Sequence, residues 1–135
     1  MTPGLYLRTR REAAGLSIDD VAERIETVPR WAQHLRRGWL EQIESDEMPA
    51  IFNTIVVLSQ VVQFDLGVLV ALSVEGHDAP RLCCVCACSE ADPCVGHSGP
   101  CTWVDVDLCS ACFFHEPADR ITIIRSASAA RDVAA

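Results

Sequence analysis

All eight cysteines of this chain lie between residues 83 and 112. The first residues, MTPGLYLRTRREAAG, are charged and lack the apolar segment and small-residue cleavage site of a secretory signal. A chain without an export signal is expected to stay in the reducing cytoplasm, where structural disulfides are rare. Cysteines at this density then indicate thiolates that bind a metal. We therefore predict a cytoplasmic protein with a metal-stabilised module.

Two C-x-x-C pairs frame the cysteine-rich stretch, and their cysteines are Cys83, Cys86, Cys109 and Cys112. Such a pair turns two thiolates toward one point, and two pairs complete a tetrahedral four-sulfur site that suits Zn²⁺. The 22 residues between the pairs are typical of zinc-binding modules. An iron–sulfur cluster also accepts four cysteines, but the knuckle-like spacing of both pairs favours zinc. The sequence predicts one structural zinc ion here.

The remaining cysteines offer a second site. Three of them share a loop with a histidine, and this set is Cys88, Cys94, Cys101 and His97. Three sulfurs and one imidazole nitrogen are a chemically sensible zinc site. Alternatively, Cys88 and Cys94 share sulfurs with Cys86 in a two-metal cluster, or some of these thiols pack as small apolar side chains. Cys84 is expected to point away from the metal, unless it supplies a fourth ligand.

The first 75 residues contain no cysteine, and their apolar residues recur at helical spacing. Gly15 is placed to end a first helix over residues 4–14. Ser17 is placed to cap a second helix, with Asp20 in its acidic first turn. The other helices are expected over 38–46, from Pro49 to Phe64, and over 66–74 with Asp65 as the cap.

The composition divides the chain into segments. The stretch VEGHDAP, residues 74–80, is rich in turn formers and is interpreted as a linker. We predict a helical domain over 1–75, a cysteine-rich zinc module over 81–118, and a short strand or frayed tail over 119–135. The apolar stretch 51–74 is interrupted by polar residues, so we expect two short buried helices there and no membrane span.

The run LRTRREAAGLSIDDVAERI resembles the first two helices of the Cro/repressor-type helix-turn-helix family, the xenobiotic-response-element family. In that family the pattern L-x-x-x-R-E-x-x-G-L-S-x-x-x-x-A is characteristic. The run LEQIESDEMPAIFNTIVVLSQVVQFDLGVLVAL resembles its later helices, so the likeness covers about residues 4–73. The resemblance implies that the third helix enters the major groove of double-stranded DNA.

The residues expected to contact DNA are Arg30, Gln33, Arg36, Arg37, Gln42 and Ser45. Guanidinium groups suit phosphates, and amide or hydroxyl groups can read base edges. Two features depart from the family pattern: the insertion TVPRWAQHLRRGW before the third helix, and the acidic residues Glu41 and Glu44 within it. A net charge of −8 also argues against a large nonspecific nucleic-acid surface.

The cysteine stretch resembles a motif of small bacteriophage and prophage proteins, C-x-x-C-x-C, an acidic turn, C, C-x-W and D-L-C-S-x-C. Cys84 stands where that motif usually has a basic residue. This likeness implies a bacterial or phage origin and leaves the function open.

We therefore expect a mainly α protein, a helix-turn-helix bundle followed by a loop-rich zinc module of the knuckle or ribbon kind. A saturated four-sulfur site has no open position for catalysis, so no enzyme is expected. The leading expectation is a small phage or bacterial transcription regulator that binds double-stranded DNA as a homodimer. The alternative is an acidic protein–protein adaptor, or an inhibitor of a host protein, that keeps the helix-turn-helix shell without binding DNA.

Overall fold

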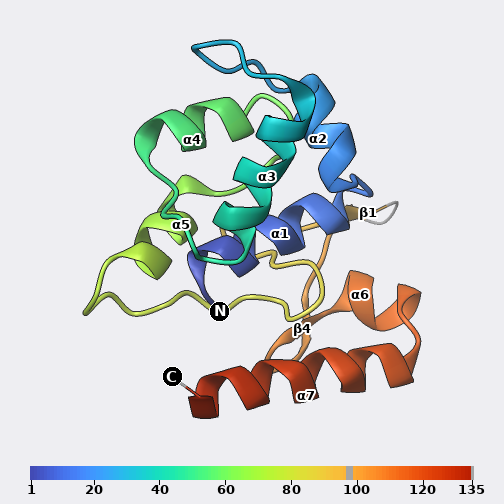
Figure 1. The fold of residues 1–135 in the computed structure, drawn as a ribbon. Coiled ribbons are helices and arrows are strands. Elements are labelled where there is room, and N and C mark those ends of the chain that lie inside the picture. Colours follow the sequence, from blue (N-terminus) through green and yellow to red (C-terminus); the bar gives the residue numbers. More distant parts are fainter. Residues whose placement is uncertain (97–98, 135) are drawn as a thin grey trace. The chain divides into compact units, whose positions relative to one another are not determined.

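The computed structural model of the protein describes residues 1–96 and 99–134. The chain divides into an N-terminal unit, Met1–Ala79, and a C-terminal unit, Pro80–Ala135. The division falls within the stretch interpreted as a linker. Within the described residues, seven helices account for about half of the chain, and four short strands form two antiparallel sheets (Figure 1). The protein is thus mainly α, as predicted.

The helices of the N-terminal unit are α1 (Pro3–Ala13), α2 (Ile18–Arg24), α3 (Gln33–Glu44), α4 (Phe52–Leu58) and α5 (Leu66–Ser73). The predicted caps are confirmed for two of them. Ser17 and Asp20 form a reciprocal capping box at the start of α2. The side chain of Asp65 accepts a hydrogen bond from the Val68 amide at the start of α5.

Two helices differ clearly from their predicted bounds. α3 begins at Gln33 and not at residue 38, because the second half of the inserted segment joins the helix. α4 begins at Phe52 and not at Pro49, and it ends at Leu58 and not at Phe64. Before α4, Asp46 takes a left-handed conformation with φ of 61° and ends α3. Its carboxylate then accepts a hydrogen bond of 2.7 Å from the Gly4 amide, so the end of α3 holds the start of α1.

The core of the N-terminal unit forms where α3 packs against α1 and α2 (Figure 1). Its largest fully buried side chains are Tyr6, Val21, Ile25, Leu40, Ile43 and Leu69. The hydroxyl of Tyr6 accepts a hydrogen bond of 2.9 Å from the Asp65 amide, which ties α1 to the start of α5. The approach of α1 to α3 is very close, because a Cβ on Gly4 would lie 2.2 Å from the carbonyl oxygen of Ile43.

The apolar stretch 51–74 forms two short helices, α4 and α5, as predicted, but the prediction that they are buried is wrong, because each buries only two residues and several of their large apolar side chains are exposed. The segment between them leaves the helical path after Leu58 and re-enters it at the Asp65 cap. In the part of the chain that the structure describes, no helix combines the length and the apolar character needed to cross a lipid bilayer.

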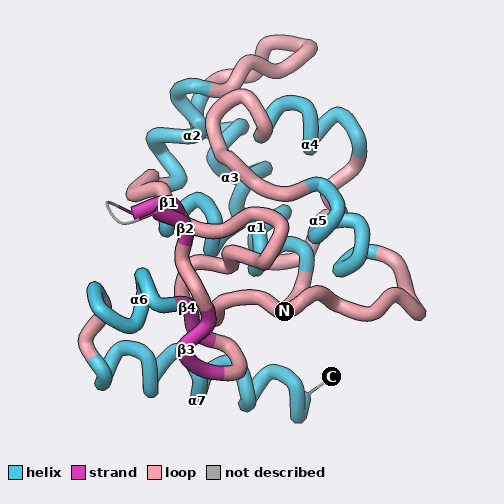
Figure 2. The backbone as a smooth tube through the Cα atoms, turned by 180° about the vertical axis from the view of Figure 1, so that it is seen from behind, coloured by secondary structure: helices cyan, strands magenta, loops and turns pink. Residues whose placement is uncertain are grey.

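The C-terminal unit consists of short strands followed by two helices. These are β1 (Val95–Gly96), β2 (Gly99–Pro100), β3 (Trp103–Asp105), β4 (Leu108–Cys109), α6 (Ser110–His115) and α7 (Ala118–Ala134). β1 pairs with β2, and β3 pairs with β4, so each sheet is a single antiparallel hairpin (Figure 2). The register places Trp103 opposite Cys109. β4 leads directly into α6, so the second C-x-x-C pair spans a strand–helix junction.

The prediction of a strand or tail after residue 118 is wrong for residues 119–134, because they belong to the helix α7. Two contacts explain this. Ile121 is buried against the cysteine cluster, and the guanidinium of Arg125 binds the carboxylates of Asp105, at 2.8 Å, and Asp107. The segment is also rich in alanine, the best helix former. Its weak apolar periodicity gave no sign of these partners, which lie on the β3–β4 hairpin.

Candidate metal centre

The first C-x-x-C pair lies in a tight turn held by the main chain. The Ala87 amide donates to the Cys83 carbonyl at 2.9 Å, and the Cys83 amide donates to the Cys88 carbonyl at 3.0 Å. Ala87 has a φ of 55°, which turns the chain back on itself. The Cys84 amide then donates to the Asp107 carbonyl at 2.8 Å and anchors this turn on the β3–β4 hairpin.

The second C-x-x-C pair is positioned by the junction of β4 and α6. Cys109 ends the strand and is the N-cap residue of the helix, and Cys112 lies in the first turn of α6. The Ser110 amide donates to the Thr102 carbonyl at 2.7 Å, and the Thr102 amide donates to the Ser110 hydroxyl at 3.1 Å. These paired bonds hold the junction in one orientation.

The two pairs meet as the sequence predicted. The Sγ atoms of Cys83, Cys86, Cys109 and Cys112 all lie within 4.8 Å of one another, and all four residues are buried. Four sulfurs around a tetrahedral zinc ion, with Zn–S bonds of about 2.3 Å, lie about 3.8 Å apart. The Cys86 and Cys109 sulfurs are 3.9 Å apart, close to that value. These four cysteines could therefore hold a metal ion.

The packing of these thiols perturbs their proton affinities. A hydrogen bond from Cys112 is the main cause that lowers the pKa of Cys83 far below its usual range. A second hydrogen bond from Cys112 lowers the pKa of Cys86 to about 6. Burial raises the pKa of Cys109 to about 11. Thiols this close compete for the same protons, and a bound cation resolves that competition because it favours every thiolate at once.

A second group of sulfurs adjoins the first. The Sγ atoms of Cys86, Cys88, Cys94 and Cys109 also lie within 4.8 Å of one another. The Cys86–Cys94 sulfur distance is 3.3 Å. Cys88 and Cys94 thus lie beside Cys86 and Cys109. Cys101 belongs to neither group, although its sulfur is 3.7 Å from that of Cys88. His97, the predicted imidazole ligand, lies outside the described residues.

Apolar side chains surround the sulfurs. Leu108 and Ile121 are buried in the same cluster, and Trp103 and Val85 pack against it. Arg81 covers the Trp103 ring, with its guanidinium carbon 4.2 Å from the ring centroid. Such a shell keeps water from the sulfurs and strengthens their attraction to a cation. Cys84 is half-buried and belongs to neither sulfur group of the described residues.

The residues expected to contact DNA all belong to the N-terminal unit, in α3 or next to it. Arg36 is half-buried. The other five are exposed, namely Arg30, Gln33, Arg37, Gln42 and Ser45. Arg36 donates to the Ile25 carbonyl, so it helps to fix the loop before α3. Arg37 forms ion pairs with Asp19 at 3.3 Å and with Glu41 at 3.0 Å.

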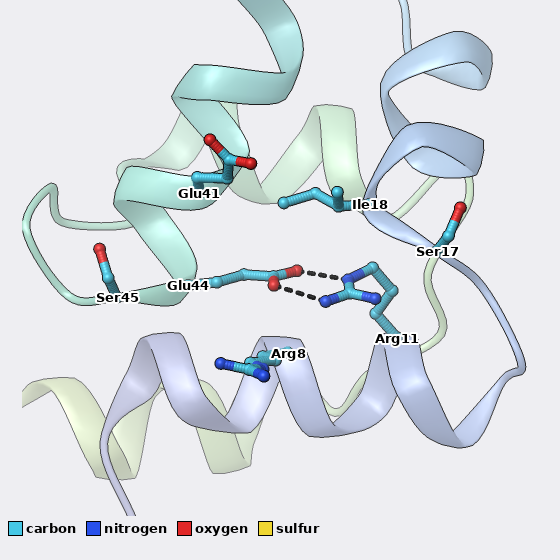
Figure 3. Close-up of a pocket in the computed structure, with 7 residues that line it drawn as sticks. All are labelled: Arg8, Arg11, Ser17, Ile18, Glu41, Glu44 and Ser45. Carbon is cyan, nitrogen blue, oxygen red and sulfur yellow. Dashed lines mark hydrogen bonds and ion pairs between the residues drawn. The ribbon is translucent and has the colours of Figure 1, made fainter.

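Glu44 has a role that the sequence did not suggest. It is one of the two acids on the expected DNA-reading helix, but its carboxylate binds the guanidinium of Arg11 through two hydrogen bonds (Figure 3). The pair joins α1 to α3 beside a pocket of about 380 Å³. Arg11 and Glu44 are 33 residues apart, so no local pattern could reveal their contact.

Comparisons of this chain with protein-family models, with curated proteins and with solved structures give no match.

Proposed function

We propose that the protein is a small DNA-binding transcription regulator whose C-terminal unit is stabilised by zinc. The observation that supports this most directly is the positive charge of residues 27–40 and the exposure of most of them. This segment contains three arginines and no carboxylate in a chain of net charge −8. Its residues 28–35 are all exposed, and the loop before α3 extends away from the other helices of its unit (Figures 1 and 2).

The segment has the chemistry that a duplex reader needs. Arg30 and Arg37 would neutralise phosphates, and Gln33 would read a base edge from the first turn of α3. Gln42 lies about 14 Å and Ser45 about 18 Å farther along the helix, so they would meet a different part of the groove. Because Glu44 is withdrawn into its pair with Arg11, it presents less negative charge to phosphates than the sequence suggested.

A regulator of this kind is expected to bind a two-fold symmetric site as a homodimer. Sedimentation equilibrium of the purified protein, with and without an operator fragment, measures that assembly. A dimer on DNA with two half-sites about one helical turn apart is the expected result.

The test of DNA binding is a gel shift at several salt concentrations, with fragments of the DNA that flanks the gene. We expect Arg30→Gln with Arg37→Gln to weaken binding by at least tenfold and to reduce its salt dependence, because two phosphate contacts are lost. The control is Arg120→Gln, which removes an exposed charge from the other unit and should leave the shift unchanged. Equal effects of both changes would contradict the proposed surface.

Zinc is the proposed ion because two pairs of buried thiolates leave no open coordination position and require no redox chemistry. Elemental analysis of the purified protein identifies the ion directly. If the protein contains iron and shows a visible absorption band, the four cysteines hold an iron–sulfur cluster and not zinc.

A second function, a protein–protein adaptor, is favoured by two observations. Arg37 lies between the carboxylates of Asp19 and Glu41, which reduces its attraction for phosphate. The start of α4 also leaves large apolar side chains in solvent, with Ile51 60% and Phe52 77% exposed. Absence of any shift at low salt, on every fragment, would favour this function over the regulator.

A further inference from the structure

The two sulfur groups of the C-terminal unit are not separate, because they have two members in common. Cys86 and Cys109 belong to both. The full set has six cysteines, namely Cys83, Cys86, Cys88, Cys94, Cys109 and Cys112. Cys83 and Cys112 complete one group, and Cys88 and Cys94 complete the other.

We propose that these six cysteines bind two divalent metal ions in one cluster, in which Cys86 and Cys109 bridge the ions. Each ion would then have two bridging sulfurs and two terminal ones. The distances fit this arrangement. Two tetrahedra that share an edge need bridging sulfurs about 3.8 Å apart, and the Cys86 and Cys109 sulfurs are 3.9 Å apart. The Cys86–Cys94 distance of 3.3 Å places the second group beside that shared edge.

Charge favours the shared cluster over two separate sites. A separate four-sulfur site and a separate site of three sulfurs and one imidazole would carry three net negative charges in total, whereas six thiolates around two divalent ions carry two. Five of the six cysteines are buried, and Cys94 is half-buried. Uncompensated charge in such surroundings is costly, so the arrangement with fewer thiolates is the more stable one.

The competing arrangement is a second, independent site built from Cys88, Cys94 and Cys101 with His97. Cys101 is placed to assist the cluster without ligating it. Its sulfur lies 3.7 Å from that of Cys88 and can donate a hydrogen bond to this terminal thiolate. Its amide donates to the Cys94 carbonyl at 2.8 Å, which fixes the loop that presents Cys94.

The decisive experiment replaces the native ions with ¹¹³Cd²⁺ in the full-length protein. Native mass spectrometry then counts the ions, and ¹H–¹¹³Cd correlation spectra identify their ligands. We expect two cadmium ions per chain. The β-protons of Cys86 and Cys109 should correlate with both cadmium resonances, and those of the other four ligands with one each. Two ions with every cysteine correlated to a single resonance would overturn the cluster.

Three variants test the ligand set by the number of ions bound, and His97→Ala is the one that separates the two arrangements. Cys94→Ser should bind one ion in a folded C-terminal unit, because the first four sulfurs remain. His97→Ala and Cys84→Ser should each bind two, since neither residue belongs to the cluster. Loss of one ion from His97→Ala would contradict the cluster and favour the independent site.

The inference rests on the metal proposed for the first four cysteines, and it is independent of DNA binding. The outcomes distinguish the two proposals. A wild-type protein that binds one ion contradicts the cluster alone, whereas a folded C-terminal unit without any metal contradicts both.

Discussion

The guanidinium of Arg11 binds the carboxylate of Glu44 through two parallel hydrogen bonds, 2.6 Å from Nε to Oε1 and 2.7 Å from Nη2 to Oε2. Both side chains are about nine-tenths buried. The third nitrogen of Arg11 donates to the Leu16 carbonyl at 2.7 Å. One side chain of α1 thus holds α3 and the turn that leads to α2, and the hydrogen bonds with Glu44 raise the pKa of Arg11.

We expect Glu44→Gln to lower the free energy of unfolding of the N-terminal unit by about 3 kcal/mol, because it leaves a buried guanidinium without its counter-charge. Urea denaturation followed by far-UV circular dichroism measures the change. The matched control is Glu41→Gln, which breaks an exposed pair with Arg37 and should cost far less, because solvent screens that pair. An equal loss of unfolding free energy in the two variants would show that the buried pair stabilises the unit no more than the exposed one does.

Two glycines that the sequence does not distinguish should respond in opposite ways to alanine. A Cβ on Gly4 would lie 2.2 Å from the Ile43 carbonyl oxygen, so Gly4→Ala forces α1 away from α3. We expect a loss of about 2 kcal/mol from that overpacking. Gly38, within α3, has open space around its Cβ position. Gly38→Ala should stabilise the unit by about 1 kcal/mol through helix propensity. Thermal melts of both variants check the signs, and a Gly4→Ala melt at the wild-type temperature would contradict the close approach.

The capping box of α2 makes stability depend on pH. Hydrogen bonds from the Ser17 hydroxyl and amide lower the pKa of Asp20 below its ordinary value of 3.8. A carboxyl group whose pKa is lower in the folded state contributes stability that is fully present above the unfolded pKa. That contribution is lost as the pH falls below 3.8 and through the folded pKa.

Ser17→Ala tests this cap. It should cost about 1 kcal/mol at neutral pH through loss of the N-cap. It should also flatten the decline of stability below pH 3.8, where Asp20 takes up its proton. Urea titrations at several pH values measure both effects, and Ser45→Ala is the control because its hydroxyl donates only to the exposed end of α3. An unchanged acid decline in Ser17→Ala would refute the assignment to Asp20.

Removal of the metal should unfold the C-terminal unit and leave the N-terminal unit folded. The apparent binding free energy of a structural zinc site is about 10–16 kcal/mol, which exceeds what the short hairpins and helices of residues 80–135 supply alone. Amide spectra recorded before and after addition of a chelator follow each unit separately. Cys112→Ser should give the same loss, whereas Cys84→Ser should retain the spectrum. Sharp, dispersed signals from a metal-free C-terminal unit would contradict this role.

Short-range features of the sequence predicted much of this structure. The spacing of the two C-x-x-C pairs predicted that four thiols would meet, because the geometry of such a pair is local. The caps at Ser17 and Asp65 could also be predicted from the sequence, since an N-cap hydrogen bond joins residues three apart. The first residues of α3 and α4 could not be predicted, because tertiary contacts overrule weak local preferences at helix ends.

Other features depend on residues that are distant in the sequence. The sequence determined that the thiols of residues 83–112 would gather and that the first 75 residues would form short helices. Only the tertiary structure decided that Cys86 and Cys109 belong to both sulfur groups, that Arg125 holds α7 to the β3–β4 hairpin, and that Glu44 faces Arg11. The reason is that spacing constrains neighbours along the chain, whereas ion pairs and shared ligands require the closure of long loops, which the packing of whole helices and hairpins determines.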